Sequence, residues 1–164
     1  MARPGRRVER TSRQAAGRAR ACRRAHAPDA AARRWLRAFQ RCVRALDYRA
    51  ARPLFAAGVY AFGTYAGVVR GRAALERTQW KRIWPTIRRF TFRLTELRCV
   101  GGGEGLCVIV PWDSAGVRPD GTTFPRPGRA TLLLVPDRRR ARWVAVHSHF
   151  SLAPGAASPS PPRR

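Results

Sequence analysis

The chain has 164 residues, of which 45% are hydrophobic, so it can form one globular domain with tails and is not disordered throughout. Its net charge is +25, and Lys81 is the only lysine among the 34 lysine and arginine residues. A coding bias toward Arg, Ala, Gly and Pro explains this excess at least as well as phosphate contacts do, so nucleic-acid binding is an alternative and not the favoured function. No apolar run approaches the roughly 20 residues that cross a bilayer, so we expect no membrane partner.

Both ends of the chain are predicted to be disordered, and the folded domain is expected to cover residues 29–152. Residues 1–28 are mostly Arg, Ala and Gly, and they cannot bury enough apolar area to offset their conformational entropy. Residues 153–164 are rich in proline. No apolar stretch typical of a secretory signal follows Arg6 and Arg7, so we expect a cytoplasmic protein.

The first folded segment is predicted to be helical. Asp29 is suited to cap a helix that extends to about Ala45, with Trp35 and Phe39 on its apolar face. Asp47 offers a second cap, but Pro53 lies too deep for a regular helix that begins there.

A strand and a third helix are expected next. Residues 59–65 (VYAFGTY) are rich in the aromatic side chains that favour a strand. Residues 72–83 are predicted to be helical, and Pro85 should end this helix. The apolar residues recur at helical spacing, at Trp80, Ile83, Trp84 and Ile87.

The rest of the folded segment is predicted to contain only strands. From Phe90 to Cys99 the apolar residues change parity, which is typical of a β-bulge. Residues 101–105 (GGGEG) indicate a hairpin turn, because no Lys-Ser/Thr pair follows them as in a phosphate-binding loop. If the hairpin were symmetric about Gly103, Cys99 and Cys107 would face each other, although two reduced, partly buried cysteines are the simpler expectation.

Three further strands are expected, over residues 106–112, 130–136 and 142–154, with a long loop over 113–128. In the last strand, strict alternation places Trp143, Ala145, His147 and His149 on one face. The order helix, helix, strand, helix and then four antiparallel strands predicts an α+β fold. We expect a strongly curved, mostly antiparallel sheet that wraps around the N-terminal helices as a cone-shaped barrel with an interior cavity.

Several segments resemble the SnoaL-like branch of the nuclear transport factor 2-like superfamily, over about residues 33–152. They are LFAAGVYAFGTYAGVVRGRAAL (54–75), QWKRIWPTIRRFTFRL (79–94), PWDSAG (111–116), RPGRATLLL (126–134) and RWVAVHSHFSL (142–152). The resemblance implies a cone-shaped α+β barrel, usually a homodimer joined through the sheet. The superfamily includes cyclases, ketosteroid isomerases, dehydratases and oligomerisation domains, so the fold does not define the function. The position of the isomerase carboxylate falls at about Gly63, which disfavours isomerase chemistry by that route.

His147, His149 and Asp113 are the candidate catalytic residues, as acid–base groups acting without a metal. If the two histidines face the cavity, either can serve as a base or orient a ligand. The alternative places both on the outer face at a dimer interface, and alternation alone does not decide between them. A metal would need a third ligand, and none is identifiable, so no metal or cofactor is expected. Glu76 is interpreted as an ion-paired surface residue.

Aromatic side chains are the candidate lining of an apolar pocket, with a purely structural role in the core as the alternative. These residues are Tyr60, Phe62, Trp80, Trp84 and Trp112.

Three functions therefore stay open. The leading hypothesis is a homodimer that holds a small apolar or aromatic ligand in its cone, with or without cyclase-like chemistry. The second is a non-catalytic assembly domain with a vestigial pocket and interface histidines. The third is nucleic-acid binding through the basic tails.

Overall fold

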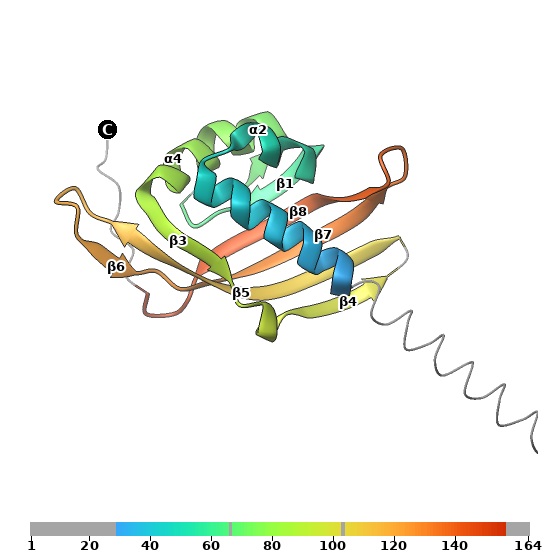
Figure 1. The fold of residues 1–164 in the computed structure, drawn as a ribbon. Coiled ribbons are helices and arrows are strands. Elements are labelled where there is room, and N and C mark those ends of the chain that lie inside the picture. Colours follow the sequence, from blue (N-terminus) through green and yellow to red (C-terminus); the bar gives the residue numbers. More distant parts are fainter. Residues whose placement is uncertain (1–28, 66, 103, 157–164) are drawn as a thin grey trace, which may run out of the picture.

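The computed structural model describes residues 29–156, except Ala66 and Gly103. The predicted N-terminal tail and most of the C-terminal tail lie outside the described residues. The first helix, residues 29–45, lies across the concave face of a curved sheet (Figure 1). Its apolar stripe is buried against the sheet, including Trp35, Leu36, Phe39 and Val43. This confirms the helix that was expected from Asp29 to about Ala45.

A short helix and a 3₁₀ turn lead into the sheet. The Asp47 side chain accepts a hydrogen bond of 2.8 Å from the Ala50 amide and so caps α2 (Tyr48–Ala51). The 3₁₀ turn η1 (Arg52–Leu54) follows. Pro53 lies in this turn, because a proline cannot donate the backbone hydrogen bond that would continue the α-helix.

The third helical segment changes its winding along its length. It consists of α3 (Arg72–Leu75), the π-helical turn η2 (Glu76–Trp80), α4 (Lys81–Ile83) and the 3₁₀ turn η3 (Trp84–Thr86). The change to 3₁₀ winding falls at Trp84 and Pro85, where the sequence predicted the helix end. In the π-helical turn, Gln79 and Trp80 are both buried, so two adjacent residues lie on the inner side of the segment.

The sheet contains eight strands, most of them antiparallel (Figure 1). They are β1 (Phe55–Phe62), β2 (Val69–Arg70), β3 (Ile87–Phe92), β4 (Arg98–Gly102), β5 (Gly105–Val117), β6 (Thr123–Pro125), β7 (Gly128–Asp137) and β8 (Arg142–Leu152). The main path is β2-β1-β8-β7-β5-β3, and β4 and β6 both pair with β5. Strands β1 and β8 pair in parallel. The sheet is strongly curved but does not close, so the expected barrel is wrong in this respect and the expected α+β fold is confirmed.

Two predicted features of the central strands are corrected. The change of parity before Cys99 comes from the 3₁₀ turn η4 (Leu94–Glu96), which separates β3 from β4. The segment expected as a loop over 113–128 continues β5 to Val117 and then forms β6 after a turn at Pro119–Gly121. Strand β6 covers only three residues and adds to the end of β5, so its own sequence gives little periodic signal.

The last strand is not regular. Between Leu133 and Leu134 of β7, the register jumps from His147 to Ala145 of β8, which leaves Val146 as the extra residue of a β-bulge. The predicted strict alternation is therefore interrupted. Ala145 and Ser148 are both buried beside inward residues of β7, whereas His147 and His149 lie on the opposite face.

The core lies between the helices and the concave face of the sheet. Its aromatic centre is formed by Phe39, whose ring centroid is 5.3–6.5 Å from those of residues in the helices and in β1, β3 and β8. Among the described helices, none is long and apolar enough to cross a membrane.

Candidate functional site

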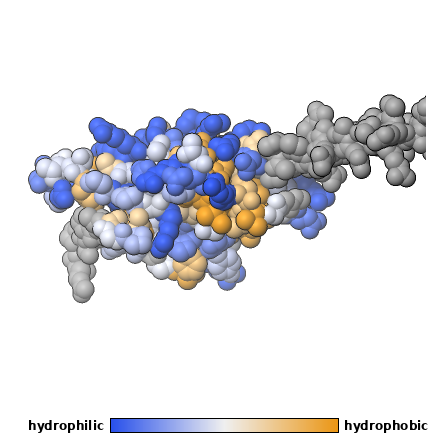
Figure 2. Space-filling model, turned by 90° about the horizontal axis from the view of Figure 1, so that it is seen from below, coloured by the Kyte–Doolittle hydropathy of each residue, from blue (hydrophilic) through white to orange (hydrophobic). Residues whose placement is uncertain are grey.

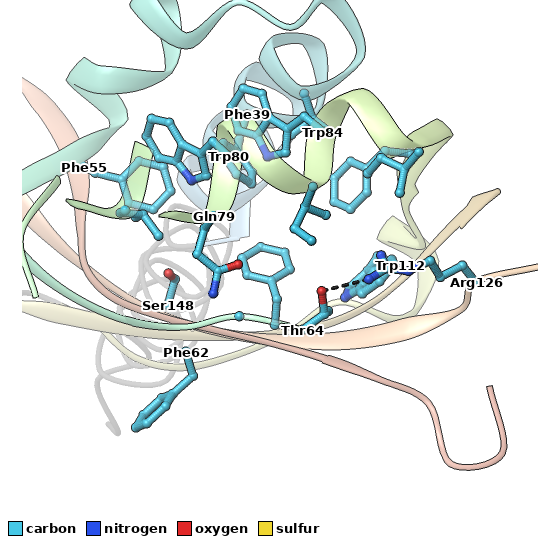
Figure 3. A pocket seen from close by; sticks show the side chains of 17 residues that line it. Phe39, Phe55, Phe62, Thr64, Gln79, Trp80, Trp84, Trp112, Arg126 and Ser148 are labelled. Carbon is cyan, nitrogen blue, oxygen red and sulfur yellow. Dashed lines mark hydrogen bonds between the residues drawn. The ribbon is translucent and has the colours of Figure 1, made fainter. Parts of the chain in front are cut away.

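A pocket lies between the helices and the concave face, partly open to solvent, with a volume of about 60 Å³ (Figure 3). Most of its wall is apolar. Trp80 and Trp84 form one side with their rings stacked at 5.1 Å, and Phe90 and Phe150 contribute from the sheet. Four polar side chains complete the wall, namely Thr64, Gln79, Arg126 and Ser148. An apolar pocket with a few polar groups is the usual form of a small-molecule site.

Arg126 is the charged residue of this pocket. It follows β6, where it exchanges two backbone hydrogen bonds with Ser114 of β5. Only 9% of its surface is exposed, and one guanidinium nitrogen donates a 2.8 Å hydrogen bond to the hydroxyl of Thr64 (Figure 3). None of the ion pairs within the described residues includes Arg126. Burial lowers the pKa of the Arg126 guanidinium, because the charged form loses its hydration.

Two residues of the pocket wall each have a buried neutral donor without a partner among the described residues. The indole nitrogen of Trp112 and the amide nitrogen of Gln79 make no hydrogen bond, although the two residues are only 1% and 6% exposed. Buried donors are normally satisfied, and an unsatisfied one costs about 1–3 kcal/mol. The Arg126 guanidinium lies 5.8 Å from the centroid of the Trp112 ring, so the charged donor and the indole are neighbours.

Gly63, directly after β1, has no side chain, and the Gln79 side chain occupies the space that one would fill. A Cβ atom added to Gly63 would overlap the Gln79 carboxamide. The position where the ketosteroid isomerase resemblance would place a carboxylate is therefore filled by an amide, which carries no charge and does not accept a proton under ordinary conditions. Gly63 directly precedes Thr64, whose hydroxyl accepts the hydrogen bond from Arg126.

His147 and His149 lie outside this pocket, on the outer face of the sheet. His147 pairs with Leu133 of β7 and His149 with Thr131. Both imidazole rings contact the Phe62 ring edge to face. The distance between ring centroids is 5.7 Å for His147 and 5.4 Å for His149. The bulge at Val146 decides this placement, because it brings Ser148 to the concave face in their stead.

Asp113 does not line the pocket either. Its carboxylate forms a two-point ion pair with Arg93, with both nitrogen–oxygen distances at 2.7 Å. The hydrogen bond from Arg93 lowers the pKa of Asp113, which makes this carboxylate a weaker base. Glu76 is ion-paired as expected, with Arg52 at 2.7 Å and Lys81 at 3.3 Å, but its side chain is buried and not on the surface.

The aromatic candidates divide into two groups. Trp80, Trp84 and Trp112 line the pocket. Phe62 borders the pocket, but its side chain points to the other face of the sheet (Figure 3). Tyr60 is 47% exposed on the same outer face, because alternation along β1 turns Val59 and Ala61 inward.

The polar pocket residues were not identified from the sequence. Gln79 lies four residues before Ile83 and so falls on the apolar stripe of the third helical segment, which was a signal for it. Arg126 alternates with its neighbours in the same way as Phe124 and Gly128, and all three are buried. Because residues 113–128 were expected to form a loop, this alternation was not recognised. As for metals, the described part of the chain contains no group of three or more His, Cys, Asp or Glu side chains that could hold an ion. Cys42, Cys99 and Cys107 are free, and Cys99 pairs with Val108, not with Cys107.

The open curved sheet with helices over its concave face defines a nuclear transport factor 2-like, cystatin-like α+β fold. Residues 30–155 match the family model of the SnoaL-like domain, and the chain belongs to this family. No curated protein matches the chain significantly.

Solved structures of low sequence identity share the fold. A nuclear transport factor 2-like superfamily protein from Salmonella enterica serovar Typhimurium has a TM-score of 0.67 at 17% identity, over 82% of this chain and 99% of its own. A ketosteroid isomerase-like protein from Erwinia carotovora gives 0.61 at 17%, over 75% and 91%. A protein with a cystatin-like fold from Novosphingobium aromaticivorans gives 0.63 at 16%, over 87% and 90%. At these identities the likeness shows the fold alone.

Proposed function

We propose that this SnoaL-like domain binds a small apolar or aromatic molecule in the pocket between its helices and the concave face of the sheet. The observation that carries the proposal is a partly open pocket whose aromatic wall also contains Arg126, a buried arginine without an acidic partner among the described residues. A buried charge in a purely structural core is normally paired.

The size of the pocket limits the ligand. A cavity of about 60 Å³ is smaller than the ~150 Å³ apolar cavity that admits benzene. The enclosed part of the ligand is therefore a group of a few heavy atoms, and the remainder extends into the open side or displaces a side chain. We propose that Ile83 and Trp84 are the side chains that move to admit the ligand, because they belong to the short turns that end the third helical segment.

Binding without proton transfer is the form of the proposal that the geometry supports best. The pocket wall contains no Asp, Glu or His among the described residues, so none of the groups that commonly act as a general base is in contact with a ligand there. Cyclase-like acid–base chemistry would need His147, His149 or Asp113, and these lie outside the wall.

The test is a titration of the full chain with benzyl alcohol, a neutral aromatic probe, followed by tryptophan fluorescence because Trp80, Trp84 and Trp112 line the pocket. Ile83→Phe narrows the pocket, and we expect it to weaken binding by about tenfold, in line with the cost of overpacking. Ile109→Phe makes the same change at a 44% exposed outer position and should leave binding unaltered. Equal affinities of the two variants, or no saturable binding, would contradict the proposal.

A second proposal is self-association through the outer face of the sheet. Exposed apolar residues lie there in register on neighbouring strands, as an outer-face cluster of Tyr60, Phe62, Val100, Ile109 and Leu133 together with the two histidines. The view from below the sheet shows apolar surface bounded by hydrophilic residues (Figure 2). Contiguous apolar patches of this kind are typical of protein interfaces.

A further inference from the structure

Resting on the proposed ligand pocket, we infer that its ligand carries a carboxylate group, which the Arg126 guanidinium binds. The pocket would then hold a small apolar or aromatic carboxylic acid, with the acid group inside and the apolar part against Trp80 and Trp84.

The first step of the argument is the charge of Arg126. An arginine is rarely buried without an acidic partner, since its charge loses hydration and gains nothing in exchange. Within residues 29–156 as described, the only side-chain acceptor of the guanidinium is the Thr64 hydroxyl, which is neutral. Every ion pair among the described residues is formed by a basic residue other than Arg126. The acidic residue Asp113, which lies beside Ser114 on β5, pairs with Arg93. Arg126 thus lacks a counter-charge in a place where a ligand can supply one.

The second step is the chemistry of the guanidinium. Among the described residues, the Thr64 hydroxyl is the side-chain acceptor of one of its five N–H donors. The remaining donors require an acceptor with several lone pairs. A carboxylate has two oxygens and about four acceptor sites, and it matches the planar fork of a guanidinium.

The third step is position. Thr64 fixes the guanidinium from one side, and Gly63 lets the Gln79 amide lie directly over the strand beside it. Trp112 is held in place on the other side by Gly128, its cross-strand partner, because a Cβ atom there would overlap the indole ring. Gln79 of η2, Trp112 of β5 and Arg126 after β6 all line the cavity, so the tertiary fold brings these three residues to one site.

The experiment compares three probes of nearly equal size on the full chain at about 0.15 M salt, where long-range attraction to the basic protein is screened. Phenylacetate carries the carboxylate, phenylacetamide replaces it with a neutral amide, and phenethylamine carries a positive charge. We expect phenylacetate to bind at least about tenfold more tightly than phenylacetamide, because hydrogen bonds to a charged group are roughly twice as strong as neutral ones. Phenethylamine should bind most weakly.

Two variants locate the selectivity. Arg126→Gln should abolish the preference for phenylacetate over phenylacetamide. Arg129→Gln removes the same charge from an exposed arginine of β7 and should keep the wild-type preference. If Arg126→Gln fails to fold, as judged by near-ultraviolet circular dichroism, the order of the three probes on the wild-type protein decides.

The outcomes separate the two proposals. Equal binding of acid and amide to the wild-type protein would overturn the carboxylate inference and leave the proposed pocket function intact. A preference that disappears equally in Arg129→Gln would also overturn it, since non-specific attraction would then explain the selectivity. If neither phenylacetate nor phenylacetamide binds, the pocket function itself fails.

Discussion

The carboxamide of Gln79 lies directly over the Cα atom of Gly63, so that the two residues share a space that holds only one side chain. This contact joins the π-helical turn η2 to the end of β1. It explains why a glycine is required at that position without any demand for an unusual backbone angle.

The contact gives the first prediction. Gly63→Ala should lower the free energy of unfolding by about 1–3 kcal/mol, because the new methyl group must displace the Gln79 amide. The double variant Gly63→Ala/Gln79→Ala should be less destabilised than the sum of the single changes, which a double-mutant cycle in denaturant measures. Gly58→Ala in the same strand meets nothing within 4 Å and serves as the control. Additive effects of the two changes would contradict the shared space.

Glu76 gives a prediction on acid stability. Its hydrogen bond with Arg52 lowers the pKa of Glu76 from 4.5 to about 2, and Lys81 adds to the shift. Because the folded-state pKa is lowered, the ion pair stabilises the protein fully above about pH 4.5 and loses its contribution as the pH falls toward 2.

The variant Glu76→Gln should therefore lower the melting temperature by about 3–6 °C at pH 7, and the difference from wild type should shrink below pH 4.5. Glu96→Gln is the matched control, since Glu96 is 52% exposed and pairs with Arg93 at 3.6 Å. A Glu76→Gln protein whose melting temperature equals that of wild type at pH 7 would rule out this role. The measurement is differential scanning calorimetry across the pH range.

The outer-face cluster predicts self-association. Leu133→Asp places a charge in the middle of this cluster and should raise the dimer dissociation constant at least about tenfold, as measured by sedimentation equilibrium. Leu46→Asp introduces the same charge at a 40% exposed residue after the first helix and should not change it. His149→Ala is expected to weaken the dimer to a smaller extent. A wild-type protein that is monomeric at high micromolar concentration would exclude this second proposal.

The candidate catalytic residues His147 and Asp113 give a further prediction. His147 and Asp113 lie outside the pocket wall, so His147→Ala and Asp113→Asn should leave the affinity for benzyl alcohol within about twofold of wild type, as surface substitutions usually do. The same fluorescence titration measures this. A tenfold loss in either variant would show that a ligand extends to these residues and would revive their proposed role.

The sequence by itself determined the order of the three helical segments and the longer strands, the buried face of the first helix, the cap at Asp47 and the hairpin at residues 101–105. These features depend on local patterns, such as apolar spacing, capping side chains and glycine-rich turns, which short segments carry on their own. The burial of Trp80 and Trp84 follows from the same kind of pattern, because bulky apolar side chains at helical spacing point toward a core.

The tertiary structure alone decided which face of β8 is concave. One extra residue, Val146, moves His147 and His149 to the outer face and Ser148 to the pocket, and a one-residue change of register depends on the pairing with β7 rather than on the strand itself. It also decided the composition of the site. Arg126, Trp112 and Gln79 are far apart in the chain, and a donor is recognised as unsatisfied only when all its neighbours in space are known.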